Sequence, residues 1–188
     1  MTLFRCFPWE RKAGDRARGG PLWFPRMLQG DGRHDVPSLY GCLYASSEAV
    51  STVVEQLARF AGTELSAAEL ARRGRPLALA TIELSGDGEV VDLDEPLVLA
   101  AEGLKPSIVA TGERARTQAD AAELYQRHPQ AAGIRWWSTF ESQWLNVTLF
   151  DRAAEALAVE DVRTLSLADD IVADAAGFLG LPVALERV

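Results

Sequence analysis

The expected strands and helices of this chain are short and follow one another in no fixed order, and this pattern limits the folds it can adopt. No regular strand–helix–strand repeat develops, which favours an α+β domain over a doubly wound parallel sheet. The expected strands are 2–7, 39–45, 77–84, 89–93, 107–110, 134–137, 145–150 and 162–165. The expected helices are 46–60, 66–74, 97–104, 117–128, 151–159 and 166–179. A turn at residues 86–88 should join the strands 77–84 and 89–93 as a hairpin.

Length and charge narrow the class of protein. A chain of 188 residues can bury a core of its own, and neither a linker nor a repeat divides it. The formal net charge of −8 disfavours wrapping around a phosphate backbone, so a nucleic-acid partner is not expected. An anionic ligand would need a locally basic pocket.

Targeting and metal-binding patterns are not found. Residues 1–12 do not have the basic-then-apolar order of a secretion signal. No apolar run reaches the roughly 18 residues that span a membrane, so we expect a cytoplasmic protein. Cys6 and Cys42 match no metal or redox spacing. His34 and His128 are too few for a zinc site, and His128 is expected to end a helix.

Polar and aromatic side chains gather between Gly32 and Glu55, which we expect to form a loop, a strand and a helix. The helix has an apolar stripe of Val50, Val53, Val54, Leu57 and Phe60. At about 100° per residue, Glu55 falls nearly opposite this stripe, beside Ser51 and Arg59. Periodicity therefore predicts that Glu55 faces away from the core, toward either bulk water or a cleft.

The irregular segment 9–36 is the most basic part of this acidic chain. It contains Arg16, Arg18, Arg26 and Arg33. Long irregular segments in compact domains are often functional or mobile. This one is either a solvated loop or part of the wall of an anion site.

The common nucleotide-binding fingerprints do not occur. The chain has no GxGxxG after a strand, no GxxxxGK[ST] and no GxSxG. Any nucleotide chemistry must therefore use another scaffold. A second informative stretch, 133–150, holds two aromatic-rich strands around residues 139–144.

The order of these motifs resembles the RES domain family. The first family block is a glycine–arginine turn, a strand ending in tyrosine and a helix bearing glutamate. These parts correspond to Gly32-Arg33, Leu43-Tyr44 and Glu55. The second block, a strand ending in serine and then an apolar strand, corresponds to 134–138 and 146–150.

Arg5, near the start of the chain, also fits the family pattern. Two positions depart from it. His34 stands where the family commonly has tryptophan, and Trp137 precedes Ser138 where proline is usual. The likeness covers about residues 2–152, which suggests one domain over 1–188 with a core of about 2–152 and a C-terminal helical extension of about 153–188.

The resemblance implies an ADP-ribosyltransferase-like fold, a mixed sheet with flanking helices, that cleaves the nicotinamide–ribose bond of NAD⁺ without a metal. Glu55 would stabilise the positive charge that develops on the ribose. Arg33 would bind the pyrophosphate, with Arg5 as a second contact.

Three further side chains receive roles from the resemblance. Tyr44 would stack on nicotinamide and its hydroxyl would orient the ribose, with Tyr40 as the next candidate. Ser138 would bind the ligand or brace Glu55. Each of these residues also has a simpler interpretation, as a solvated helix or loop side chain or as an ordinary strand residue.

The resemblance further implies a bacterial toxin that is held inactive by a cognate antitoxin protein. The sequence leaves open whether ADP-ribose passes to water, to phosphate or to a protein side chain, and whether the chain forms a homodimer. An alternative is a catalytically silent RES-like module that binds a nucleotide or a partner. A third interpretation is a partner-binding surface on the helix 166–179.

Overall fold

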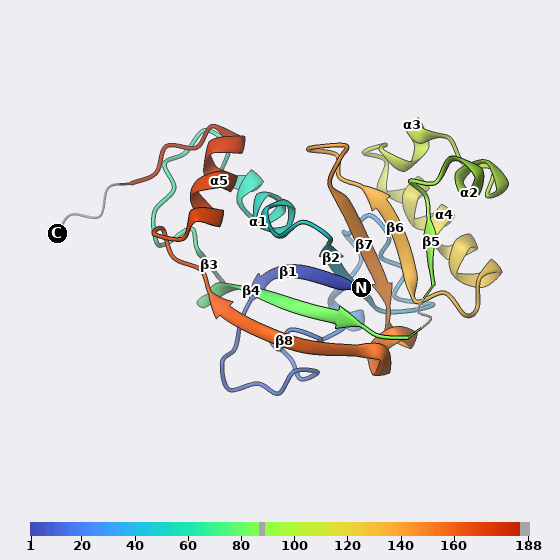
Figure 1. Cartoon of the computed structure of the whole chain (residues 1–188), viewed down its shortest axis with the longest axis horizontal. Helices are drawn as coiled ribbons and strands as arrows, with labels where there is room; N and C mark the ends of the chain where they lie inside the picture. Colours follow the sequence, from blue (N-terminus) through green and yellow to red (C-terminus); the bar gives the residue numbers. More distant parts are fainter. Residues whose placement is uncertain (87–88, 185–188) are drawn as a thin grey trace.

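The computed structural model describes residues 1–86 and 89–184 and forms one α+β domain around a mixed sheet (Figure 1). Its strands are β1 Thr2–Pro8, β2 Cys42–Ser46, β3 Ala71–Arg72, β4 Arg75–Leu84, β5 Val90–Asp92, β6 Gly133–Trp137, β7 Leu145–Phe150 and β8 Leu157–Thr164. Its helices are α1 Ala49–Leu57, α2 Pro96–Ala101, α3 Pro106–Val109, α4 Arg114–Arg127 and α5 Asp170–Leu179, with 3₁₀ turns at Arg26–Leu28, Ala58–Phe60 and Asp151–Ala156. The predicted α+β class is confirmed.

The strand order is β3-β4-β1-β2-β7-β6-β5, and β8 also pairs with β4. The described pairs are antiparallel except for β5, which runs parallel to β6. Among residues 1–86 and 89–184, no helix combines the length and the apolar character needed to cross a membrane.

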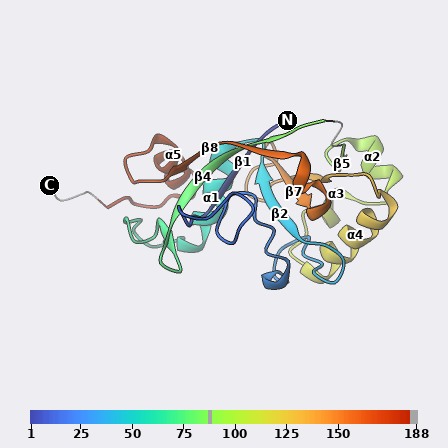
Figure 2. The same cartoon turned by 90° about the horizontal axis from the view of Figure 1, so that it is seen from below.

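The helices cover two separate parts of the sheet. Helices α1 and α5 lie together against β1 and β4, whereas α2, α3 and α4 gather beside β5 and β6 (Figures 1 and 2). In the first part, Val53, Val54 and Leu57 of α1 share one core with Val172 and Ala176 of α5. These side chains of α1 belong to the predicted apolar stripe, which is why α1 turns Glu55 away from the core.

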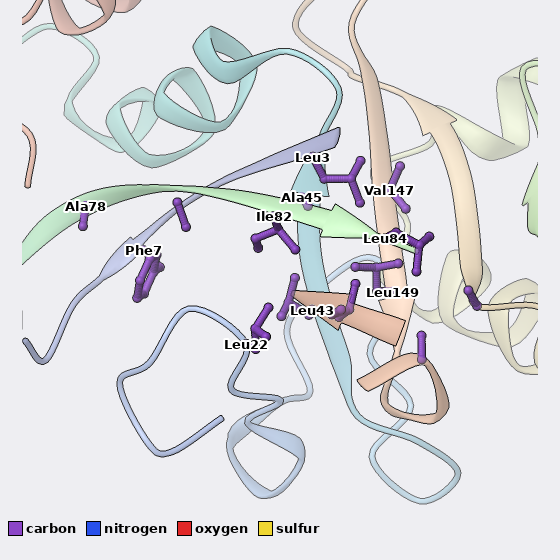
Figure 3. Packing of buried hydrophobic residues seen from close by; sticks show 14 residues of the cluster. Leu3, Phe7, Leu22, Leu43, Ala45, Ala78, Ile82, Leu84, Val147 and Leu149 are labelled. Atoms are coloured by element: carbon purple, nitrogen blue, oxygen red, sulfur yellow. The ribbon is translucent and has the colours of Figure 1, made fainter. Parts of the chain in front are cut away.

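The other face of the sheet has a core of its own. Figure 3 shows Leu3, Leu43, Ile82 and Leu149, from four neighbouring strands, gathered in this core. Leu22 of the long N-terminal segment lies with them, so this segment covers that face of the sheet.

The predicted hairpin between 77–84 and 89–93 is wrong. Strand β5 pairs with β6, because the two edges of β4 are already occupied by β1 and β8. Of the predicted turn at 86–88, Asp87 and Gly88 lie outside the described residues.

The chain after residue 150 also differs from prediction. The expected helix 151–159 is a short 3₁₀ turn followed by β8, and β8 then pairs along β4. Thr81 lies opposite Asp161 but Ile82 lies opposite Val159, so Glu160 bulges out of the ladder. A bulge shifts the alternation of inward and outward side chains by one residue, which hides the period-two pattern of a strand. The segment predicted as a helical extension thus contributes both β8 and α5.

Two shorter predictions are corrected as well. Residues 66–74 were expected to form a helix, and at their start the Ser66 N–H donates to Glu69 Oε2 at 2.9 Å. This contact lies within a turn rather than a helix, because Arg73 and Gly74 reverse the chain so that β3 pairs with β4. Residues 106–109 form α3 instead of a strand, with Pro106 in the first helical position.

We expect the centre of the sheet to dominate stability. Leu149 of β7 is 0% exposed, whereas Leu97 of α2 is 79% exposed. Leu149→Ala leaves a cavity and should lower the free energy of unfolding by about 2–5 kcal/mol. Leu97→Ala removes the same atoms from the surface and should change it by no more than about 0.5 kcal/mol. Urea unfolding followed by circular dichroism measures both, and equal losses would contradict this placement of β7.

Candidate active site

A cavity of about 270 Å³ lies where α1, β2 and the β6–β7 pair meet the loop before Asp35 and the start of α4. Its lining combines charged, aromatic and amide side chains. The lining residues are Cys6, Gly32, Arg33, Tyr44, Ala45, Thr52, Glu55, Gln56, Arg114, Trp136, Thr139 and Asn146. Of the predicted site residues, the structure brings Arg33, Tyr44 and Glu55 together in this cleft.

Glu55 presents its carboxylate to the cleft. Asn146 Nδ2 donates to Glu55 Oε1 at 3.5 Å, and Ser51 Oγ donates to Asn146 Oδ1 at 3.1 Å. Ser51 therefore directs the amide NH₂ of Asn146 toward Glu55. Although the glutamate is open to the cleft, the surrounding walls remove enough water to raise its pKa above the usual value.

Several neighbours oppose this desolvation. The hydrogen bond from Asn146, the charges of Arg33 and Arg114, and the side chain of Ser138 each favour the ionised form and lower the pKa of Glu55. Glu55 is thus a carboxylate with a raised pKa whose charge is held by oriented polar groups. Such perturbed groups in a cleft are typical of functional sites.

Arg33 is buried and fixed in one orientation. Its Nη1 donates to the carbonyl oxygens of Val109 at 2.9 Å and Thr111 at 2.6 Å. Its guanidinium carbon lies 4.9 Å from the ring centroid of Trp136, a cation–π distance. Among the described residues, the side-chain hydrogen bonds of Arg33 run from Nη1 alone, so its other N–H groups remain for a ligand.

The loop that carries Arg33 is built around one carboxylate. Asp35 Oδ2 accepts from the N–H of Gly30 at 2.9 Å and of Gly32 at 2.7 Å, and Asp35 Oδ1 accepts from the Tyr44 hydroxyl at 2.7 Å. A Cβ on Gly32 would lie 2.5 Å from the Tyr44 hydroxyl oxygen, so this close approach requires glycine.

The Tyr44 hydroxyl has a structural role in this loop. The hydroxyl donates to Asp35 and accepts from the His34 N–H at 3.0 Å, so it positions the loop. The ring of Tyr44 still lines the cleft and is available to stack on a planar ligand group.

Two predicted site residues do not lie in the cleft. Tyr40 is 0% exposed, donates its hydroxyl to the His34 carbonyl oxygen at 2.9 Å, and packs on Phe150. Arg5 lies on the face of β1 opposite Cys6, because successive strand residues alternate in direction. Its guanidinium donates to the Pro21 carbonyl oxygen and lies over Phe7.

The other arginines of the basic segment also lie outside the cleft lining. Arg16 pairs with Glu155 at 3.5 Å, and Arg26 pairs with Asp151 at 3.8 Å. Arg18 lies 6.0 Å from the Trp23 ring centroid. Arg33 alone of the four reaches the cleft.

Ser138 lies behind the cleft at the end of β6. It is 2% exposed, and its Oγ accepts from the Phe140 N–H at 3.2 Å. Its side chain also lowers the pKa of Glu55.

Sequence reasoning missed Asn146, Arg114 and Thr117 as parts of the site. Asn146 is an amide near the start of the mostly apolar strand β7, and this is a signal that could have found it. The helix that was expected to start at Thr117 begins earlier, at Arg114, and the Thr117 hydroxyl donates to the Arg33 carbonyl oxygen at 2.6 Å. Such a contact between distant segments cannot be read from local patterns.

His34 supports the loop from beneath. Its Nδ1 lies 2.8 Å from Thr148 Oγ1, and its ring meets Trp136 edge-on with centroids 5.3 Å apart. Burial, together with the charges of Arg33 and Arg114, lowers the pKa of His34 to about 3. The imidazole is therefore neutral at ordinary pH.

The fold and the cleft together define an α+β protein whose polar cleft sets one glutamate against two arginines beside aromatic rings. The family model for the RES domain matches residues 2–170. The chain therefore belongs to the RES domain family, which is associated with NAD-related toxin activity. The match continues through β8 to the first residue of α5. A search of curated proteins finds no match.

The buried His34 should make folding sensitive to acid. An unfolded histidine titrates near about 6.5, so the unfolded state binds more protons than the folded state between that pH and about 3. The contribution of His34 to the free energy of unfolding is therefore fully present above the unfolded pKa and is lost progressively as the pH falls below it. Between pH 7 and pH 5 this group should remove about 2 kcal/mol from the free energy of unfolding.

The measurement is urea unfolding at both pH values for the wild type and for His34→Asn, whose amide can still meet Thr148. The variant should lose less stability between pH 7 and pH 5 than the wild type does. Equal losses in the two proteins would show that other groups carry the acid sensitivity.

Proposed function

We propose that this protein is an NAD⁺-consuming enzyme that cleaves the nicotinamide–ribose bond. The observation that carries the proposal is the placement of the Glu55 carboxylate in one cleft with Arg33 and the faces of Tyr44 and Trp136. A charged group for the ribose, a cation for phosphate and flat aromatic surfaces are what a dinucleotide requires.

The chemistry follows from the charges that develop. When the C1–N bond of the nicotinamide riboside breaks, its electron pair leaves with neutral nicotinamide and the ribose becomes an oxocarbenium ion. Glu55, held by Asn146 and Ser138, stabilises that cation. The acceptor, an atom of water, phosphate or a protein side chain, then forms a bond to C1, and a proton that it carries passes to the solvent.

The remaining groups bind and orient the substrate. Arg33 offers its free N–H groups to the pyrophosphate, and its contacts with Val109, Thr111 and Trp136 keep the guanidinium from moving. The ring of Tyr44 stacks on nicotinamide. These groups need no metal ion for their roles.

The biological role that we propose is that of a cytoplasmic toxin held inactive by a cognate antitoxin. Membership of the RES domain family supports it. ADP-ribose passes to water, to phosphate or to a protein side chain, so all three acceptors belong in an activity assay. The alternative, a RES-like module that binds a nucleotide or a partner without turnover, is an outcome of the same assay.

The direct test is release of nicotinamide from NAD⁺ by the purified protein, with phosphate and cell lysate offered as acceptors. Glu55→Gln keeps the shape of the side chain but removes its charge and should lower the rate by about 10²–10³. Glu48→Gln is the matched control, because Glu48 is exposed just before the same helix and does not line the cleft.

Equal rates for the two glutamine variants would remove Glu55 from the mechanism. Binding of NAD⁺ without nicotinamide release by the wild type would favour the silent module.

The raised pKa of Glu55 should appear in the pH profile. The ionised carboxylate is the active form. The value of kcat/KM should therefore be at its maximum above the folded pKa of Glu55 and fall as the pH drops through that pKa. The midpoint of this acid limb should lie at a pH above the usual pKa of glutamate. Circular dichroism at each pH separates the limb from the unfolding linked to His34, and a limb at the usual value would argue against a desolvated Glu55.

A further inference from the structure

Arg114 is a second guanidinium in the cleft, and no part of the proposed mechanism uses it. It is the first residue of α4, is exposed, and lines the cavity with Arg33 and Glu55. Within residues 1–86 and 89–184 its side chain makes no hydrogen bond or ion pair. Other arginines of the same helix do pair, Arg116 with Asp120 at 3.1 Å and Arg127 with Glu102 at 2.8 Å.

The charge of Arg114 acts on three titratable groups in and beside the cleft. It lowers the pKa of Arg33, after the larger effect of burial, and it also lowers those of His34 and Glu55. In a chain of net charge −8, the cleft therefore brings together two guanidinium groups and one carboxylate. An anion between the arginines would remove their mutual repulsion.

The backbone sets the separation of the two arginines. Arg33 is bonded to the carbonyl oxygens of Val109 and Thr111, and α4 begins three residues after Thr111. One turn further along, the Thr117 hydroxyl donates to the Arg33 carbonyl oxygen at 2.6 Å. The Arg33 loop and the start of α4 are thus joined on both sides of Arg114.

We propose that Arg33 and Arg114 form a two-arginine subsite for the diphosphate bridge of a dinucleotide. The buried, fixed Arg33 takes the inner phosphate and the exposed Arg114 takes the outer one. A diphosphate held in this way lies in the cavity that also contains Glu55, with its ribose directed toward that carboxylate. The choice of a dinucleotide rests on the proposed function, whereas the pairing of the two arginines does not.

The test is calorimetric binding of ADP-ribose, which carries a diphosphate, and of AMP, which carries one phosphate. Arg114→Ala should raise the Kd for ADP-ribose by about ten- to a hundredfold, because one charge-assisted contact is lost. The Kd for AMP should rise less. Arg114→Lys keeps the charge without the planar fork and should give an intermediate value.

Arg116→Ala is the matched control, because Arg116 is an exposed arginine two positions along the same helix and does not line the cavity. It should bind ADP-ribose as the wild type does. Raising the salt concentration should weaken ADP-ribose binding to the wild type more than to Arg114→Ala, because salt screens the charge of Arg114, which the variant lacks. If Arg114→Ala and Arg116→Ala bind ADP-ribose equally, the subsite is overturned.

Turnover separates this inference from the proposed function. In an active enzyme, Arg114→Ala should raise KM for NAD⁺ more than it lowers kcat, as loss of uniform binding does. An active enzyme in which KM is the same for Arg114→Ala and Arg116→Ala would overturn the subsite alone. A wild type that binds ADP-ribose through Arg114 but releases no nicotinamide would overturn the proposed function alone.

Discussion

The cleft depends first on the carboxylate of Asp35. It accepts hydrogen bonds from two backbone N–H groups, those of Gly30 and Gly32, and from the hydroxyl of Tyr44. Asp35 is only 7% exposed, so these bonds lie in a poorly solvated place where each is strengthened and its loss would leave buried polar groups unpaired. The loop has one conformation as a result, and that conformation delivers Arg33 to the carbonyl oxygens of Val109 and Thr111.

Glu55 reaches the same cleft by an independent route. The apolar face of α1 is held by the core that it shares with α5, and Ser51, one turn before Glu55, orients Asn146 of β7 toward the glutamate. Arginine and glutamate therefore come from two separately packed parts of the domain. Strands β2 and β7, paired from Cys42 to Ser46, connect these parts and fix the distance between them.

The parts of the fold and of the site that depend on local sequence patterns could be predicted. The apolar stripe of α1 gave the direction of Glu55, and the aromatic strands β6 and β7 were apparent from the sequence. The pairing between distant segments could not be predicted from the sequence. The bulge at Glu160 disguised β8, and β5 pairs with a strand more than forty residues away rather than with its neighbour. Arg114 was missed and Tyr40 was misplaced because loop packing, not local periodicity, sets their surroundings.

The contact between α1 and α5 also has a consequence for how the protein is made. Synthesis proceeds from the N-terminus, so the glutamate-bearing helix leaves the ribosome well before Val172, Ala175 and Ala176 have been polymerised. Until those residues emerge, the apolar side of α1 has no complete partner and its orientation is not fixed. The cleft can therefore be completed only after Val172, Ala175 and Ala176 have left the ribosome, long after Arg33 and Glu55 have been made.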